Sequence, residues 1–172
     1  FRTFMADAKT DHLSFGSALV KSLFLARRLK AVWGAQERVG ILLPPSMAGA
    51  LVNFAAWFLG KVPVNLNYTL SANGIESCIR QCDVKNVVGS KELMAHLKLE
   101  LETPVVFLED LAKDPTLSEK LRSLLTAIFC PYFLIQTVLG AERKLELDDV
   151  ATIIFSSGST GDPKGVELTH YN

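Results

Sequence analysis

The residues of this chain with the clearest chemical potential lie close together, near its C-terminal end. The apolar run 151–154 is followed by Phe155 and then by hydroxyls, glycines and a lysine within residues 156–165. Glycines let a backbone turn tightly and present its N–H groups, hydroxyls add further donors, and a lysine adds a positive charge. Such a loop suits the binding of a polyphosphate. The candidate binding residues are Ser156, Ser157, Gly158, Ser159, Thr160, Gly161, Lys164 and Gly165.

The spacing of this loop differs from that of the common Walker-type loop, which needs Gly, four residues and then Gly-Lys-Ser/Thr. Here Pro163 precedes Lys164 and Gly165 follows it. The sequence of residues 156–165, Ser-Ser-Gly-Ser-Thr-Gly-Asp-Pro-Lys-Gly, resembles instead the signature of the AMP-forming adenylate enzymes. That superfamily includes acyl-CoA and acyl-carrier-protein synthetases, luciferases and peptide-synthetase adenylation domains. A Gly/Ser-rich surface turn is the alternative, although turn chemistry does not require the Pro-Lys-Gly ending.

The resemblance extends upstream over nearly the whole chain. Residues 12–29, 38–46 and 60–71 look like the family's opening helix, first core strand and next strand with its loop. The segment 63–69, Pro-Val-Asn-Leu-Asn-Tyr-Thr, is most similar to one subgroup. These are bacterial fatty acyl–acyl-carrier-protein synthetases fused to a lysophospholipid (2-acylglycerophosphoethanolamine) acyltransferase. The resemblance implies that residues 1–172 are the N-terminal subdomain of an AMP-dependent ligase, truncated just after the phosphate-binding loop.

The resemblance also implies an activity. In the family, ATP and Mg²⁺ activate a carboxylate to an acyl-adenylate, and a thiol then displaces AMP; here we expect a fatty acid and either CoA or acyl carrier protein. Ser159 and Thr160 are the expected contacts of the β- and γ-phosphates. Lys164 is expected to act as a charge clamp, because an unperturbed lysine is protonated at neutral pH. The family's remaining catalytic residues lie downstream, so we expect the chain to be inactive without the rest of its parent protein.

Two other functions stay open at this point. An adenylation domain for an amino or aryl acid belongs to the same superfamily, and no residue here forms the acid pocket that would distinguish it. A non-catalytic nucleotide-binding or interaction module belongs to another class. It would retain the loop without the reaction.

Composition places the chain among folded proteins and excludes some partners. With 172 residues, 49% of them hydrophobic, it can bury one core as one domain. Its formal net charge is zero, which argues against a nucleic-acid partner. The chain begins with Phe1 and shows no signal peptide, so we interpret it as an excised piece of a cytoplasmic protein, or of one at the cytoplasmic face of the inner membrane.

The cysteines do not indicate a disulfide framework or a metal site. There are three, an odd number, which argues against a secreted disulfide scaffold. Cys78 and Cys82 share one face of an expected helix, but the three histidines are scattered. We predict that both cysteines are small buried apolar residues and that the chain has no metal ligands.

Hydrophobic periodicity predicts an α/β fold. We expect a mainly parallel sheet of about five strands with helices on both faces, because strands and helices alternate. The phosphate loop then lies at the carboxyl ends of the strands. The expected helices are 14–33, 46–59, 71–82 and 91–97, and the expected strands are 39–43, 62–66, 84–88, 105–108 and 151–155.

The segment 117–139 is less regular. Residues 117–129 suit an amphipathic helix, which Pro131 interrupts. The apolar run 124–139 is shorter than the roughly 20 residues that a membrane span needs. We expect a helix and connector on the domain surface; a patch that contacts a membrane or a partner, the missing remainder of the parent chain included, is the alternative.

Four further polar residues receive expectations of their own. Asp162 should point to solvent or cap a turn, with a role toward Mg²⁺ as the alternative. Asp148 and Asp149 should lie in a solvated loop or pair with Arg143 or Lys144, with an acid/base role as the alternative. His170 should lie at the start of a helix after the loop and cap or pack against that helix, with direct catalysis as the alternative.

Overall fold

A computed structural model describes residues 3–7, 12–156 and 162–172 of the chain. Its main element is a six-stranded sheet with the order β6-β5-β3-β4-β7-β8. All neighbouring strands are parallel except β7 and β8, which are antiparallel. The predicted α/β class with a mainly parallel sheet is confirmed. The strands are β3 (Arg38–Leu42), β4 (Val62–Asn65), β5 (Val87–Gly89), β6 (Val105–Phe107), β7 (Val150–Ser156) and β8 (Lys164–Thr169), with β1 (Thr3–Met5) and β2 (Leu13–Ser14) forming a separate antiparallel pair.

Helices connect the strands and flank the sheet. They are α1 (Phe15–Trp33), α2 (Met47–Phe58), α3 (Ala72–Gln81), α4 (Lys91–Leu97), α5 (Leu108–Ala112), α6 (Leu117–Phe129), the 3₁₀ helix η1 (Tyr132–Leu134) and α7 (Ile135–Leu139). The serines predicted to begin the first three helices do so. The side chains of Ser14, Ser46 and Ser71 each accept a hydrogen bond from the backbone N–H three residues later.

The C-terminal segment adds a sixth strand, β8, to the roughly five that were expected. The helix that was expected to begin at His170 is wrong. His170 lies in a turn that follows β8. Residues of β8 pair with β7 from Lys164 to Thr169, so the strand depends on a partner that local periodicity does not show.

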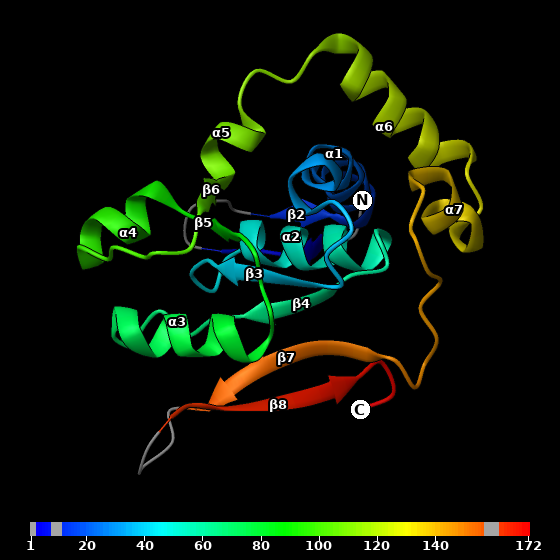
Figure 1. Cartoon of the computed structure of the whole chain (residues 1–172). Helices are drawn as coiled ribbons and strands as arrows, with labels where there is room; N and C mark the ends of the chain where they lie inside the picture. Colours follow the sequence, from blue (N-terminus) through cyan, green and yellow to red (C-terminus); the bar gives the residue numbers. More distant parts are fainter. Residues whose placement is uncertain (1–2, 8–11, 157–161) are drawn as a thin grey trace.

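The sheet separates two cores, because successive side chains of a strand point to opposite faces. Val39 and Ile41 of β3 belong to a cluster with the buried side chains of α1 and α2. Leu42 belongs to a second cluster with Ile75 and Cys78 of α3. Figure 1 shows α1 and α2 on one side of β3 and β4, and α3 on the other. Helices therefore cover both faces, as predicted.

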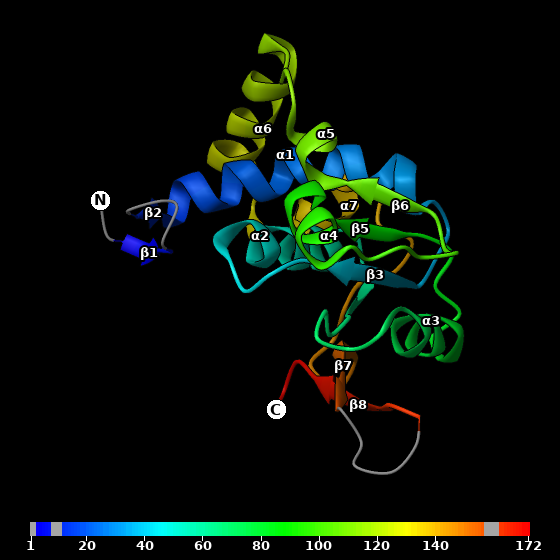
Figure 2. The same ribbon diagram turned by 90° about the vertical axis from the view of Figure 1, so that its left-hand side faces the viewer.

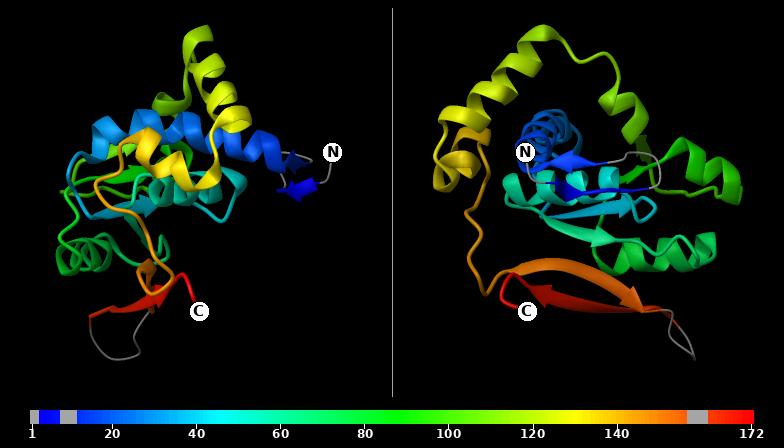
Figure 3. Two further views of the ribbon diagram at one scale, coloured as in Figure 1. Left: turned by 90° about the vertical axis from the view of Figure 1, so that its right-hand side faces the viewer. Right: turned by 180° about the vertical axis from the view of Figure 1, so that it is seen from behind.

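Helix α6 covers α1 but leaves much of its own apolar surface exposed. Figure 2 shows α6 projecting beyond α1, on the side of the molecule away from β7 and β8. Leu121, Leu124, Leu125 and Ile128 are all exposed. The predicted surface helix with its connector is confirmed, and the views in Figure 3 show the connector after α7 leading to β7. No helix in the described ranges is both long and apolar enough to cross a membrane.

Candidate functional site

The candidate site lies where the connections after β3 and β4 diverge. The chain leaves β3 toward α2 on one face of the sheet, and it leaves β4 toward α3 on the other (Figure 1). In open α/β sheets, ligands bind in the crevice that such a divergence creates at the carboxyl ends of the strands. A hollow of about 450 Å³ occupies this position. Both connections line it, together with Ile154 and Phe155 of β7.

The two ends of the predicted phosphate loop meet beside this hollow. Ser156 at the end of β7 pairs with Lys164 at the start of β8, and the Ser156 hydroxyl donates to the Lys164 carbonyl oxygen at 3.4 Å. Residues directly opposite in an antiparallel pair project from the same face. Ser156 and Lys164 therefore present a hydroxyl and an exposed ammonium side by side. Within the described residues, no carboxylate forms an ion pair with Lys164.

The other residues predicted for this loop lie outside the described part of the chain, so their positions stay predictions. They are Ser157, Gly158, Ser159, Thr160 and Gly161.

Gly165 lies close to the side chains of β7. A Cβ atom on this residue would lie 3.2 Å from Cζ of Phe155 and 3.3 Å from Cγ2 of Ile153. The β8 backbone thus passes directly over the Phe155 ring, which is buried. A side chain at this position would push the arm that carries Lys164 away from β7.

Helix α3 contacts residues 162–163, which lead from the loop into β8. The sequence did not indicate this contact. Gln81 Nε2 donates to the carbonyl oxygen of Pro163 at 3.1 Å, and Ser77 Oγ donates to Asp162 Oδ1 at 3.4 Å. The two donors lie one helical turn apart on the same face of α3. Asp162 is exposed, as predicted, and its carboxylate faces a hydroxyl of α3.

A half-buried polar network supports the end of β7, and sequence reasoning missed it. Asn65 Nδ2 donates to Asn53 Oδ1 and to Thr152 Oγ1, both at 2.9 Å. Thr152 Oγ1 donates in turn to the carbonyl oxygen of Pro63 at 2.9 Å. Thr152 and Ser156 lie on the same face of β7, because side chains alternate along a strand. The network therefore joins α2, β4 and β7 on the face that carries Ser156. The sequence does offer a signal for this network, because Asn53, Asn65 and Thr152 are polar residues within otherwise apolar segments.

His170 and Asp149 have structural roles in the described chain. The His170 ring packs against Trp57 of α2 with ring centroids 5.6 Å apart, and its backbone N–H donates to the Asp149 carbonyl at 3.1 Å. The Asp149 carboxylate lies 3.9 Å from Arg143, the pairing that was predicted. Within residues 162–172, the helix that His170 was expected to cap or pack is absent, and the His170 ring packs on α2 instead.

The cysteines are the buried apolar residues that were predicted. Cys78 and Cys82 are free and buried, and burial raises the pKa of the Cys78 thiol to about 11. A thiol with so high a pKa is a poor nucleophile at neutral pH. Within the described ranges, no three His, Cys, Asp or Glu side chains gather as metal ligands.

The family assignment follows from comparison with known proteins. The model of the AMP-binding enzyme family matches residues 2–172. The chain belongs to the AMP-binding enzyme family. Its relatives include 2-succinylbenzoate–CoA ligase of Staphylococcus aureus, at 28% identity over 94% of the chain and 33% of the relative. Another is the mitochondrial medium-chain acyl-CoA ligase of Rattus norvegicus, at 28% identity over 79% of the chain and 25% of the relative. Bacitracin synthase 1 of Bacillus licheniformis is 31% identical over 54% of the chain and 2% of the relative.

Solved structures show the same fold. VinN in complex with 3-methylaspartate superimposes with a TM-score of 0.69 at 23% identity, over 98% of this chain and 43% of that one. The o-succinylbenzoate CoA synthetase of Bacillus subtilis, with its acyl-adenylate intermediate, gives 0.65 at 20% identity, over 92% and 37%. The chain thus spans about a third of the CoA ligase of Staphylococcus aureus and a far smaller part of bacitracin synthase 1.

Proposed function

We propose that this chain carries the phosphate-binding part of an AMP-forming ligase, which activates a carboxylic acid with ATP and transfers it to a thiol. The observation that carries the proposal is the pairing of Ser156 with Lys164 at the carboxyl end of β7. A hydroxyl and an ammonium that forms no ion pair within the described residues project there from one face, beside the hollow at the strand ends. An anion is the ligand that this pair of groups favours.

The proposed reaction assigns a role to these groups. A carboxylate oxygen attacks the α-phosphorus of ATP, the bond to pyrophosphate breaks, and negative charge develops on the departing phosphate oxygens. Lys164, Ser156 and the proposed loop donors at 157–161 would stabilise that charge, because donors fixed beforehand need no reorganisation during the reaction. Mg²⁺ would supply further positive charge to the phosphates when bound. Lys164 acts in this scheme as a fixed charge.

For the substrate we propose a fatty acid, with CoA or acyl carrier protein as the thiol. The likeness of residues 63–69 to acyl–acyl-carrier-protein synthetases supports this choice, as does the similarity to a protein named medium-chain acyl-CoA ligase. A fused lysophospholipid acyltransferase and a place in the cytoplasm, at the inner face of the membrane, belong to the same proposal. An aryl or amino acid is the second candidate, which the similarity to 2-succinylbenzoate–CoA ligase and bacitracin synthase 1 favours.

The test is acid-dependent exchange of labelled pyrophosphate into ATP, by the chain and by any longer gene product that contains it. Palmitate, an aryl acid and a set of amino acids are compared. We expect exchange with palmitate in the longer product, and no pyrophosphate release from palmitate, ATP and Mg²⁺ by the chain alone. Lys164→Ala should lower the rate by about 10²-fold, as loss of one charge-stabilising donor does. Lys144→Ala, which removes a charge from the exposed connector, should leave it unchanged. Exchange that survives Lys164→Ala would refute the assigned role.

A further inference from the structure

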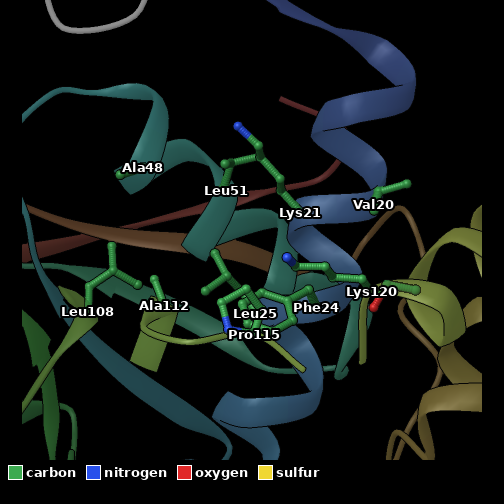
Figure 4. Close-up of a pocket in the computed structure, with 11 residues that line it drawn as sticks. Val20, Lys21, Phe24, Leu25, Ala48, Leu51, Leu108, Ala112, Pro115 and Lys120 are labelled. Carbon is green, nitrogen blue, oxygen red and sulfur yellow. The ribbon is translucent and has the colours of Figure 1, made fainter. Parts of the chain in front are cut away.

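An apolar cavity of about 470 Å³ lies on the opposite side of α2 from the candidate site. Helices α1, α2, α5 and α6 form its walls, and Figure 4 shows the side chains that line it. Ala48 and Leu51 of α2 face this cavity, whereas Ala50 and Asn53 of the same helix line the hollow at the strand ends. A third hollow, which shares lining residues with both spaces and is also lined by Asp7, Glu92 and Glu109, lies between them.

Carbon atoms make up nearly all of the cavity wall. Phe24 and Leu25 of α1, Leu51 of α2 and Leu108 of α5 form its base. Water gains few hydrogen bonds in such a space, and genuinely empty protein cavities are apolar ones that accept apolar ligands. The cavity therefore favours a hydrocarbon group over water.

Polar contacts hold the outer wall in place, so the cavity exists before any ligand enters. Arg28 of α1 makes a bidentate contact with Glu119, with both N···O distances 2.8 Å. The same guanidinium donates to the carbonyl oxygens of Leu111 and Lys113, each at 2.7 Å. It also lies over the Phe24 ring, 4.6 Å from the centroid. These bonds fix the α5–α6 connector above α1.

Arg27 makes a second attachment, donating to Thr126 Oγ1 at 2.8 Å and to Ser123 Oγ at 3.4 Å. Hydrogen bonds from arginines hold α6 against α1. Several apolar side chains of α6 remain exposed.

Two lysines give the cavity a positive rim. Lys21 of α1 and Lys120 of α6 both line it and are exposed. Figure 4 shows the Lys120 side chain reaching toward Phe24 and Leu25, whereas the Lys21 ammonium points away from them. Among the described residues, neither ammonium has a carboxylate within ion-pair distance. Lys21 also borders the adjoining hollow, which Asp7, Glu92 and Glu109 line. An apolar space with the ammonium groups of Lys21 and Lys120 at its edge suits a molecule with a hydrocarbon chain and an anionic head.

We propose that this cavity binds a single-chain carboxylate amphiphile, with its hydrocarbon chain against Phe24, Leu25 and Leu51 and its head group between Lys21 and Lys120. The site is distinct from the phosphate loop and does not require ATP. The proposal stands independently of the ligase function, because binding is measured here without nucleotide or turnover.

The first experiment titrates the chain with octanoate, decanoate and laurate below their micelle concentrations, by isothermal calorimetry without ATP. We expect saturable binding of one molecule, tightening about fourfold for each added methylene. Decanol and decylamine carry the same chain with a neutral or a positive head, and they should bind more weakly than decanoate. Absence of saturable binding, or an affinity independent of chain length, would overturn the proposal.

The second experiment tests the position of the head group. Lys21→Gln and Lys120→Gln should each weaken decanoate binding two- to fivefold, the usual effect of an exposed charge pair, and leave decanol binding unchanged. Lys144→Gln removes an equal charge far along the chain and should have no effect. Equal losses for decanoate and decanol would argue against a head group at these lysines.

The third experiment fills the cavity. Ala48 and Ala112 line it and are exposed at its mouth, so Ala48→Phe and Ala112→Phe should each reduce decanoate affinity at least tenfold. Ala95→Phe, on the exposed surface of α4, is the matched control and should bind as the unaltered chain does. Far-UV circular dichroism identifies any variant that fails to fold, in which case the other variant decides the result. Binding that survives in a folded cavity-filling variant would contradict the proposed site.

The source of the carboxylate amphiphile is tested with phosphatidylglycerol and phosphatidylcholine vesicles that contain or lack laurate. Transfer of free laurate to the protein, blocked by Ala112→Phe, supports the proposal. Vesicle binding that needs phosphatidylglycerol, persists in Ala112→Phe and occurs without any decanoate binding would show that this face is a membrane surface instead.

Discussion

At the scale of single residues, the candidate site depends on polar groups that lie in apolar surroundings. Asn53, Asn65 and Thr152 satisfy one another across α2, β4 and β7. The three side chains are half-buried, and a polar group that loses its partner there costs free energy, so the network stabilises the fold only while all its members are present. The network lies on the same face of β7 as Ser156. Loss of one of its members should therefore both destabilise the sheet and alter the orientation of the loop.

We expect Thr152→Val to lower the free energy of unfolding by about 1–3 kcal/mol, because it leaves the Asn65 amide and the Pro63 carbonyl without their partner. Chemical denaturation monitored by circular dichroism measures this loss. Thr137→Val makes the same chemical change at an exposed residue of α7 and should stay within about 0.5 kcal/mol. Equal effects of the two substitutions would show that the network contributes nothing.

At the scale of elements, an ion pair between Arg28 and Glu119 attaches α6 to α1. The pKa of the Glu119 carboxyl falls from 4.5 to about 2, chiefly because Arg28 donates hydrogen bonds to it, with further bonds from Thr116. A carboxyl with a lowered pKa in the folded state stabilises the protein above its unfolded pKa. That contribution is lost as the pH falls from about 4.5 toward 2.

The corresponding prediction compares the pH dependence of unfolding in two variants. Glu119→Gln should flatten the decline in the free energy of unfolding between pH 4.5 and 2. Glu100→Gln, at an exposed position without a described ion pair, should retain the full decline. If both variants follow the parent curve, Glu119 does not titrate with the lowered pKa.

Strand β3 packs closely against β5 and the residues that lead into it, which gives a further prediction about stability. A Cβ atom on Gly40 of β3 would lie 2.9 Å from Val84 Cγ1 and 3.0 Å from Val87 Cγ2. Gly40→Ala should therefore destabilise the chain by about 1–3 kcal/mol, the usual cost of overpacking a core. A Cβ on Gly16, in α1, would meet nothing within 4 Å, so Gly16→Ala should raise stability by up to about 1 kcal/mol. Thermal or urea unfolding would contradict the packing argument if both changes had the same sign.

Elements with local signals were predictable from sequence, and elements that depend on distant partners were not. The serine caps of α1, α2 and α3 and the bounds of α6 follow from residues within the same helix. Strand β8 was missed because Gly165 and the exposed residues after it form a strand only against β7. The five-residue helix α5 is too short to show a periodicity.

The candidate site likewise has residues that a local motif predicts and residues that only distant contacts bring together. Ser156 and Lys164 were predicted from the loop motif, which is a local pattern. The hydrogen bonds from Ser77 and Gln81 to the loop span more than 80 residues of sequence. The Asn65–Thr152 contact spans a similar separation. Only the parallel pairing of β4 with β7 brings these groups together.

At the scale of the whole molecule, two kinds of chemistry occupy opposite sides of α2. The hollow at the carboxyl ends of β3, β4 and β7 is next to the hydroxyl and ammonium of the loop. The cavity beneath α6 is apolar with a cationic rim. A phosphate-rich ligand and a hydrocarbon ligand should therefore perturb different residues of the same chain.

An amide NMR titration of the chain with Mg²⁺-ATP and with pyrophosphate shows whether the loop at residues 156–165 binds phosphate. Both ligands should bind weakly and shift the signals of residues 156–165 most. Smaller shifts are expected at Ser77 and Gln81, which contact residues 162–163. Lys164→Ala should remove these shifts, whereas Lys144→Ala should retain them. The account is contradicted if the loop signals stay still at saturating ligand, or if the largest shifts fall on α1 and α6.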